Sequence, residues 1–132
     1  MSKQSNSYKF VYFVISVFFL ILFNLYTSTY LSAISQDTIL FLPGLKLNYM
    51  ENTGAAFSIL QDYKIVLIIF AVTAIIGIFC YLVNYLKEFT MMNGFMISLL
   101  LSGIACNLFE RIAFGFVRDY FELSFINFPV FN

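Results

Sequence analysis

Three long stretches without a charged side chain limit what this chain can fold into. Aspartate, glutamate, lysine and arginine are absent from residues 10–36, 65–86 and 89–109. Each stretch has at least the roughly 20 residues that a helix needs to cross the hydrocarbon of a bilayer. With 61% apolar and 20% aromatic residues, the chain is also too hydrophobic for an ordinary soluble domain.

The sequence therefore predicts an integral membrane protein whose residues 1–132 form a single membrane domain. Three transmembrane helices are expected at about residues 10–33, 65–86 and 89–110. Extramembrane segments are expected at about 35–63 and at 112–132. Lys3 and Lys9 precede the first helix, as basic residues do in a cleaved signal peptide. The apolar run of this helix exceeds the roughly 7 to 15 residues of a signal-peptide core, so we expect the helix to be retained. Charge does not settle the orientation, because lysine and arginine are spread almost evenly over the two sides.

Composition excludes several classes of function. The net charge is zero, so no basic excess favours a nucleic-acid partner. Histidine is absent, which argues against a histidine metal site and against a histidine-activated nucleophile, and no cofactor is expected. Cys80 and Cys106 are expected near opposite membrane faces, too far apart for a disulfide.

The extramembrane segments have the pattern of short strands. Residues 39–44 and 45–49 are predicted to pair around a Pro-Gly turn, and residues 115–123 form another β-like stretch. The predicted fold class is an all-α integral membrane protein with a small extramembrane β-sheet on the membrane surface.

Polar residues gather where the apolar stretches end. Residues 52–58, with the sequence Asn-Thr-Gly-Ala-Ala-Phe-Ser, expose backbone that either another chain or a neighbouring helix can approach. One side of the third helix is expected to carry Asn107, Glu110 and Arg111. They form either a binding site or a polar helix end whose arginine reaches the lipid headgroups. The hydroxyls of residues 27–29 are expected to bond helix carbonyls or a neighbouring helix.

Asp119 is the best candidate for a catalytic group. Two carboxylates that share a proton can cleave a peptide bond, because the ionised one takes a proton from water while the protonated one polarises the carbonyl. The alternative is an ion pair of Asp119 with Arg118 or Arg111. Neither Glu110 nor Glu122 is a convincing second acid, since residues 119 and 122 of a strand point to opposite faces.

Four ordered blocks give the chain a resemblance to the bacterial lipoprotein signal peptidases, signal peptidase II. The blocks are residues 52–58, Gly103 with residues 107–111, residues 115–120, and Phe131-Asn132. The resemblance implies a multi-pass aspartic endopeptidase of the bacterial inner membrane, four-helical when complete, that cuts prolipoproteins just before their lipid-bearing cysteine. Prolipoproteins and membrane lipids are the implied partners. Asp119 matches the first catalytic aspartate. The resemblance also implies that the substrate is bound by Asn52, Gly54, Asn107 and Arg111.

The chain also departs from the family pattern. Asn24 and Ser28 stand at the positions of an aspartate and a lysine, Glu110 at the position of an aspartate, and Ser102 and Cys106 at glycine positions. The family's second catalytic aspartate and fourth helix are expected to begin three residues beyond Asn132, so a truncated enzyme is the leading expectation. A catalytically inactive binding protein is the alternative, and a purely structural membrane subunit is disfavoured by the four blocks.

Overall fold

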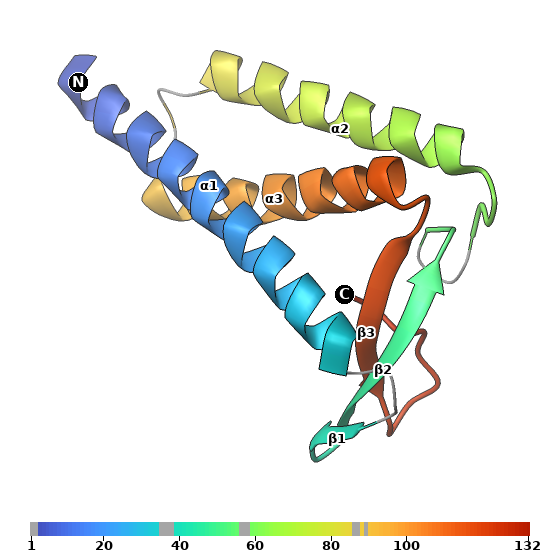
Figure 1. Cartoon of the computed structure of the whole chain (residues 1–132). Helices are drawn as coiled ribbons and strands as arrows, with labels where there is room; N and C mark the ends of the chain where they lie inside the picture. Colours follow the sequence, from blue (N-terminus) through green and yellow to red (C-terminus); the bar gives the residue numbers. More distant parts are fainter. Residues whose placement is uncertain (1–2, 35–38, 56–58, 86–87, 89) are drawn as a thin grey trace.

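The computed structural model describes residues 3–34, 39–55, 59–85, 88 and 90–132. Its helices and strands follow one another along the chain as α1 (Lys3–Ile34), β1 (Ile39–Leu42), β2 (Leu45–Asn52), α2 (Lys64–Tyr85), α3 (Met91–Ala113) and β3 (Val117–Leu123). Figure 1 shows the long helices side by side, with the small sheet at one end. Residues 56–58 of the polar segment 52–58, and residues 86–87 between the second and third expected helices, lie outside the described residues.

Within the described chain, three helices are long and apolar enough to cross a membrane, which confirms the predicted fold class. The first of them begins at Lys3, earlier than the expected start near residue 10. Much of the helix surface is apolar and exposed, as at Phe19 (63%) and Phe23 (66%) of α1. Such side chains suit a lipid environment, since lipid is as apolar as they are.

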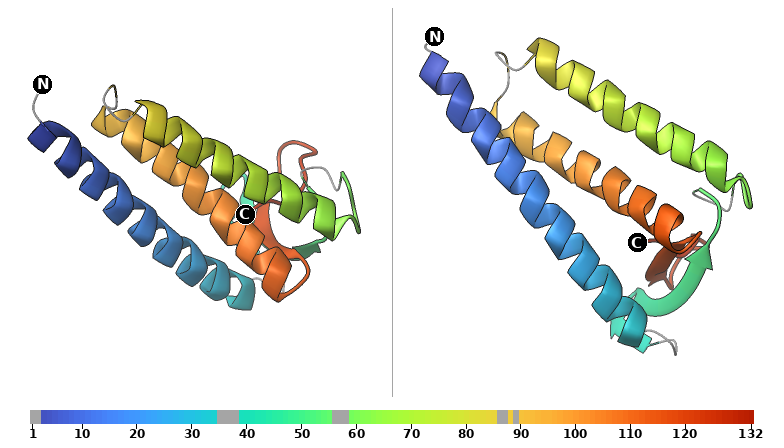
Figure 2. Two further views of the ribbon diagram at one scale, coloured as in Figure 1. Left: turned by 90° about the horizontal axis from the view of Figure 1, so that it is seen from above. Right: turned by 45° about the horizontal axis from the view of Figure 1, so that its top comes forward.

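Helix α3 lies between α1 and α2, parallel to the first and antiparallel to the second (Figure 2). Phe13, Leu82 and Leu101 bring one buried side chain from each helix into a common apolar cluster. Small polar side chains let α3 approach its neighbours closely. Ser98 is fully buried there, and its hydroxyl donates to the Gly94 carbonyl at 2.8 Å. Cys80 is exposed, Cys106 is buried, and both thiols are free.

The sheet is antiparallel with strand order β1-β2-β3. Pro43 and Gly44 connect β1 to β2, and Gly44 has a φ of +86°, which favours glycine at the second corner of such a turn. The sheet lies at the end of the bundle where α1 and α3 finish (Figure 1).

Register in the sheet brings the two predicted polar segments together. Met50 lies opposite Asp119 and Asn52 opposite Val117, so the end of β2 meets the start of β3. Asn52 and Asp119 are thus diagonal neighbours on adjacent strands, within reach of each other. Phe131 continues the sheet on the outer side of β3 through a bridge to Phe121.

A substitution in α3 tests the helix packing. Ser98→Leu should lower the stability of the protein in detergent micelles by about 1–3 kcal/mol, because the larger side chain has no room between α3 and α1. The control is Thr73→Leu on the exposed surface of α2, which should change the melting temperature little. Equal melting temperatures for the two variants would contradict the packing described above.

Candidate functional site

Asp119 lies at the centre of the candidate site. It is 4% exposed and sits on β3 between the buried side chains of Val117 and Tyr120. The Asn52 side-chain amide at the end of β2 donates to Oδ2 of Asp119 at 2.8 Å. Of the two ion pairs considered as alternatives for Asp119, the one with Arg118 is not formed, because Arg118 pairs with Glu110 instead.

Asn52 is itself held in place by the loop that follows β2. Its Oδ1 accepts the backbone N–H of Gly54 at 2.9 Å, and its Nδ2 also donates to the Ala55 carbonyl at 3.4 Å. An asparagine that bonds the backbone two residues further on stabilises a local turn. The amide that faces Asp119 is therefore fixed by its own backbone.

Arg111 connects this loop to the last turn of α3. Its Nη2 donates to the Gly54 carbonyl at 2.9 Å, and its Nη1 donates to the Asn107 carbonyl at 3.3 Å. Its Nε is buried and has no hydrogen-bond partner among the described residues. The guanidinium is therefore held in place by two protein carbonyls.

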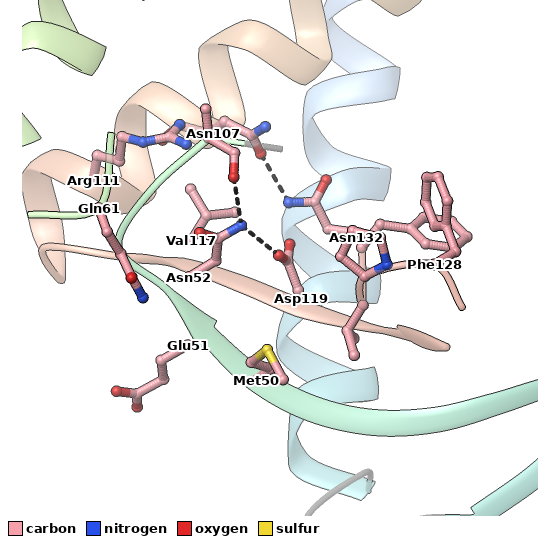
Figure 3. A pocket seen from close by; sticks show the side chains of 14 residues that line it. Met50, Glu51, Asn52, Gln61, Asn107, Arg111, Val117, Asp119, Phe128 and Asn132 are labelled. Atoms are coloured by element: carbon pink, nitrogen blue, oxygen red, sulfur yellow. Dashed lines mark hydrogen bonds between the residues drawn. The ribbon is translucent and has the colours of Figure 1, made fainter. Parts of the chain in front are cut away.

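Asn107 completes the site from α3. Its Oδ1 accepts from the side-chain amide of Asn132 at 3.2 Å. In Figure 3 the side chains of Asn52, Asn107 and Asn132 lie around the Asp119 carboxylate, whereas Glu51 points away from it. A pocket of about 250 Å³ opens between these groups. Its lining is Met50, Glu51, Asn52, Ala55, Gln61, Asn107, Arg111, Val117, Asp119 and residues 128–132.

The structure thus brings together the five residues singled out from the sequence. Asn52, Asn107, Arg111 and Asp119 line the pocket, and Gly54 is bonded to two of them. Sequence reasoning missed Asn132 and Gln61 as pocket residues. The final Phe-Asn block was the available signal for Asn132, but nothing in the sequence pointed to Gln61.

Burial raises the pKa of the Asp119 carboxyl above its usual value of 3.8. Desolvation of the charged form is the largest cause. The hydrogen bond from Asn52 and the positive charge of Arg111 act in the opposite direction, and Glu110 raises the pKa slightly more. The net result is a carboxyl group that keeps its proton to higher pH than an exposed aspartate does.

Glu110 forms a separate buried ion pair behind the pocket. Its carboxylate accepts from Arg118 Nη2 at 2.6 Å and from the hydroxyl of Ser28 at 2.8 Å. The Ser28 bond crosses from α1 to α3, one of the two outcomes predicted for that hydroxyl cluster, while Thr27 bonds the Phe23 carbonyl of its own helix. In the described part of the chain, no group of three or more His, Cys, Asp or Glu side chains could hold a metal ion.

The fold and the pocket define a polytopic membrane protein with a buried carboxyl group among amides at one end of its helices. A family model described as signal peptidase (SPase) II matches residues 15–132. The chain therefore belongs to the signal peptidase II family.

Individual relatives agree with this assignment. The chain is 39% identical over 89 residues to a lipoprotein signal peptidase of Streptococcus pneumoniae, which is 67% of this chain and 57% of the relative. It is 35% identical over 98 residues to the enzyme of that name from Enterococcus faecalis, which is 73% of this chain and 60% of the relative. The chain thus spans about 57–60% of the length of these curated relatives.

Two solved structures share the fold. Both are described as bacterial membrane enzymes, and both cover 91% of this chain. One has a TM-score of 0.77 at 24% identity over 76% of its own chain, and the other has a TM-score of 0.73 at 23% identity over 80%. This likeness supports the arrangement of helices and sheet.

The raised pKa of Asp119 predicts a pH-dependent effect of Asp119→Asn on stability. The folded protein holds the Asp119 proton more tightly than the unfolded chain, so this group favours folding most below the unfolded pKa near 3.8 and loses that contribution as pH rises through the folded pKa. Asparagine carries no charge at any of these pH values. The variant should therefore melt above the wild type at pH 7, with the difference shrinking towards pH 3. A variant that melts at lower temperature at pH 7 would contradict the burial argument.

Proposed function

We propose that this protein is a membrane aspartic endopeptidase of the bacterial inner membrane that removes the signal peptide of lipid-modified prolipoproteins. The cut is made just before the diacylglyceryl cysteine. The observation that carries the proposal is the Asp119 carboxyl group, 4% exposed and faced by amides, in a chain of the signal peptidase II family. The sheet and pocket lie where the helices end, so the scissile bond would be met at the lipid boundary, where a lipidated cysteine is anchored.

In this proposal Asp119 is one member of a proton-sharing acid pair. One carboxylate takes a proton from the attacking water, while the other, protonated, donates a hydrogen bond to the scissile carbonyl oxygen. Proton transfer to the departing amine then completes hydrolysis. A raised pKa suits this role because it favours the protonated form that one member of the pair must adopt.

Among the described residues, no second carboxyl group is directed towards Asp119 as a partner in the pair. Glu110 is engaged by Arg118, Glu51 points away from Asp119, and Glu122 accepts from Asn48 at 2.7 Å. The family resemblance expects the second aspartate three residues beyond the position of Asn132. The proposal therefore includes an acid from that position. Residues 128–132, which would directly precede it, already line the pocket.

The substrate is proposed to bind through Asn52, Gly54, Asn107 and Arg111. Arg111 lines the pocket, so its guanidinium places a positive charge beside the backbone of a bound extended peptide. Asn52 and Asn107 carry both donors and acceptors, which match peptide N–H and C=O groups. Together these groups would orient the scissile bond towards Asp119, and orientation alone can contribute several kcal/mol to catalysis.

A second candidate function is a catalytically inactive protein that binds lipidated signal peptides. Two observations favour it. Of the two carboxyl residues that line the described pocket, Glu51 points away from Asp119 (Figure 3). Asn24 and Ser28 stand at the family's charged positions. Binding without cleavage would use the same asparagine and arginine groups. The experiment below separates the two functions.

The test is cleavage of a diacylglyceryl-modified prolipoprotein in proteoliposomes that contain the protein expressed from its complete reading frame. Wild type should release the signal peptide, and Asp119→Asn should slow release by at least about 100-fold, the usual range for loss of a general acid or base. Cleavage is followed by gel mobility and mass spectrometry. Glu122→Gln, altered on the same strand, is the control and should cleave normally.

Two results would contradict the proposal. Cleavage by Asp119→Asn at the wild-type rate would remove Asp119 from the mechanism. Binding of the lipidated substrate without any cleavage by wild type would favour the inactive binding protein. A prolipoprotein whose cysteine is replaced by serine, and so carries no lipid, should be a poor substrate if the proposed specificity is correct.

A further inference from the structure

Glu110 is a second buried carboxylate near Asp119, but its partners are of a different kind. Its side chain is 5% exposed, and it accepts four hydrogen bonds. Oε1 accepts from the Ser28 hydroxyl at 2.8 Å and from Nε and Nη2 of Arg118 at 2.8 and 2.6 Å. Oε2 accepts from the backbone N–H of Arg118 at 2.8 Å. Hydrogen bonds to an ionised acceptor are short and strong, so this carboxylate is firmly tied to protein groups.

These four bonds join three elements, of which α1 is far from the other two in the sequence. Ser28 belongs to α1, Glu110 to the last turn of α3 and Arg118 to the start of β3. Arg118 is held both by its backbone and by its side chain, and its guanidinium also lies 5.1 Å from the centroid of the Phe114 ring. The position and the rotation of this residue are therefore both restrained.

Arg118 directly precedes Asp119 in the strand. Successive side chains of a strand point to opposite faces, so a restraint on Arg118 on one face also sets where Asp119 points on the other. The amide of Asn52 meets Asp119 at 2.8 Å only if β3 keeps this position relative to β2. No ion pair of Asp119 itself with Arg118 contributes, since that cation is used by Glu110.

We infer that Glu110 is a positioning residue for Asp119: it holds the start of β3 against α1 and α3 and so aims the reacting carboxyl group at the pocket. This inference rests on the proposed function, because aiming matters for hydrolysis only if Asp119 takes part in it. Among the described residues, Glu110 does not line the pocket and forms no hydrogen bond with Asp119. Its effect on the reaction is therefore indirect.

The length of the Glu110 side chain is what the arrangement requires. Aspartate, the residue that the family resemblance expects at this position, is shorter by about one carbon–carbon bond, roughly 1.5 Å. Bonds of 2.6–2.8 Å would then stretch well beyond the roughly 3.2 Å limit of a good hydrogen bond unless the segments moved. The short side chain of Ser28 could not extend to restore its hydrogen bond to the withdrawn carboxylate. A change to the family's usual residue should therefore be harmful in this chain.

The experiment compares Glu110→Asp with Glu122→Asp, which makes the same change near the far end of β3. For Glu110→Asp we expect kcat/KM for lipidated prolipoprotein to fall about 10- to 100-fold, mainly in kcat, as for a misplacement of about 1 Å. The pH at which the acid limb of the profile is half-maximal should rise, because the Asn52 hydrogen bond that lowers the pKa of Asp119 is loosened. Glu122→Asp should change kcat/KM less than twofold.

Amide hydrogen exchange provides a measurement that does not depend on cleavage. The Arg118 N–H is donated to Glu110 in the wild type, so its exchange should accelerate in Glu110→Asp while amides in the middle of α3 stay protected. If Glu110→Asp fails to fold, Ser28→Ala replaces it, with the same shifts at smaller size because three of the four bonds remain.

Two outcomes would overturn the inference. One is a Glu110→Asp protein with wild-type kcat/KM and unchanged Arg118 exchange. The other is a loss of activity that follows the melting temperature with no change in the pH profile, as a purely structural role would give. If the wild type itself does not cleave, the proposed function fails, and the Arg118 exchange together with the Asp119 carboxyl titration still decides whether Glu110 positions that group.

Discussion

Two carboxyl groups are buried at one end of the helices, and the difference between their donors governs the rest of the structure. Removal of an ionised carboxylate from water is costly unless charged or hydrogen-bonding partners replace the water. Glu110 receives a guanidinium, a backbone N–H and a hydroxyl, so its charge is compensated. Asp119 receives amides, and burial raises its pKa. The first carboxylate can serve as a structural tie, whereas burial favours the protonated form of the second.

The connection between α3 and β3 makes this division possible. The helix ends at Ala113, and Gly115, with a φ of +92°, returns the chain so that its N–H donates to the Arg111 carbonyl at 3.1 Å. A glycine in this conformation is a common helix end. The tight return brings the start of β3 back beside the last turn of α3, so Glu110 can reach Arg118 on one face of the strand. Arg111, next along the helix, reaches the Gly54 loop on the pocket side.

Much of this architecture could be predicted from the sequence, because its signals are local. The three helices and the sheet were predicted from uncharged stretches, a Pro-Gly turn and alternating residues. The ordered polar blocks predicted the site residues Asn52, Asn107, Arg111 and Asp119. The partners of these side chains could not be predicted, since Asn52 and Asp119 are 67 residues apart and meet only through the β2–β3 register. The same limit left an ion pair of Asp119 with Arg118 open as an alternative, because the two residues are neighbours in the sequence. Strand geometry turns their side chains apart.

The central claim is that burial raises the pKa of the Asp119 carboxyl group while neighbouring amides keep that group in place. The most direct measurement is a titration of the protein in micelles, with the Asp119 carboxyl carbon followed by ¹³C NMR and assigned by its absence in Asp119→Asn. The account predicts a midpoint above the ordinary value of 3.8. A midpoint at or below that value would mean that the amides and Arg111 outweigh desolvation, and Asp119 would then be a permanently ionised group rather than one member of a proton-sharing pair.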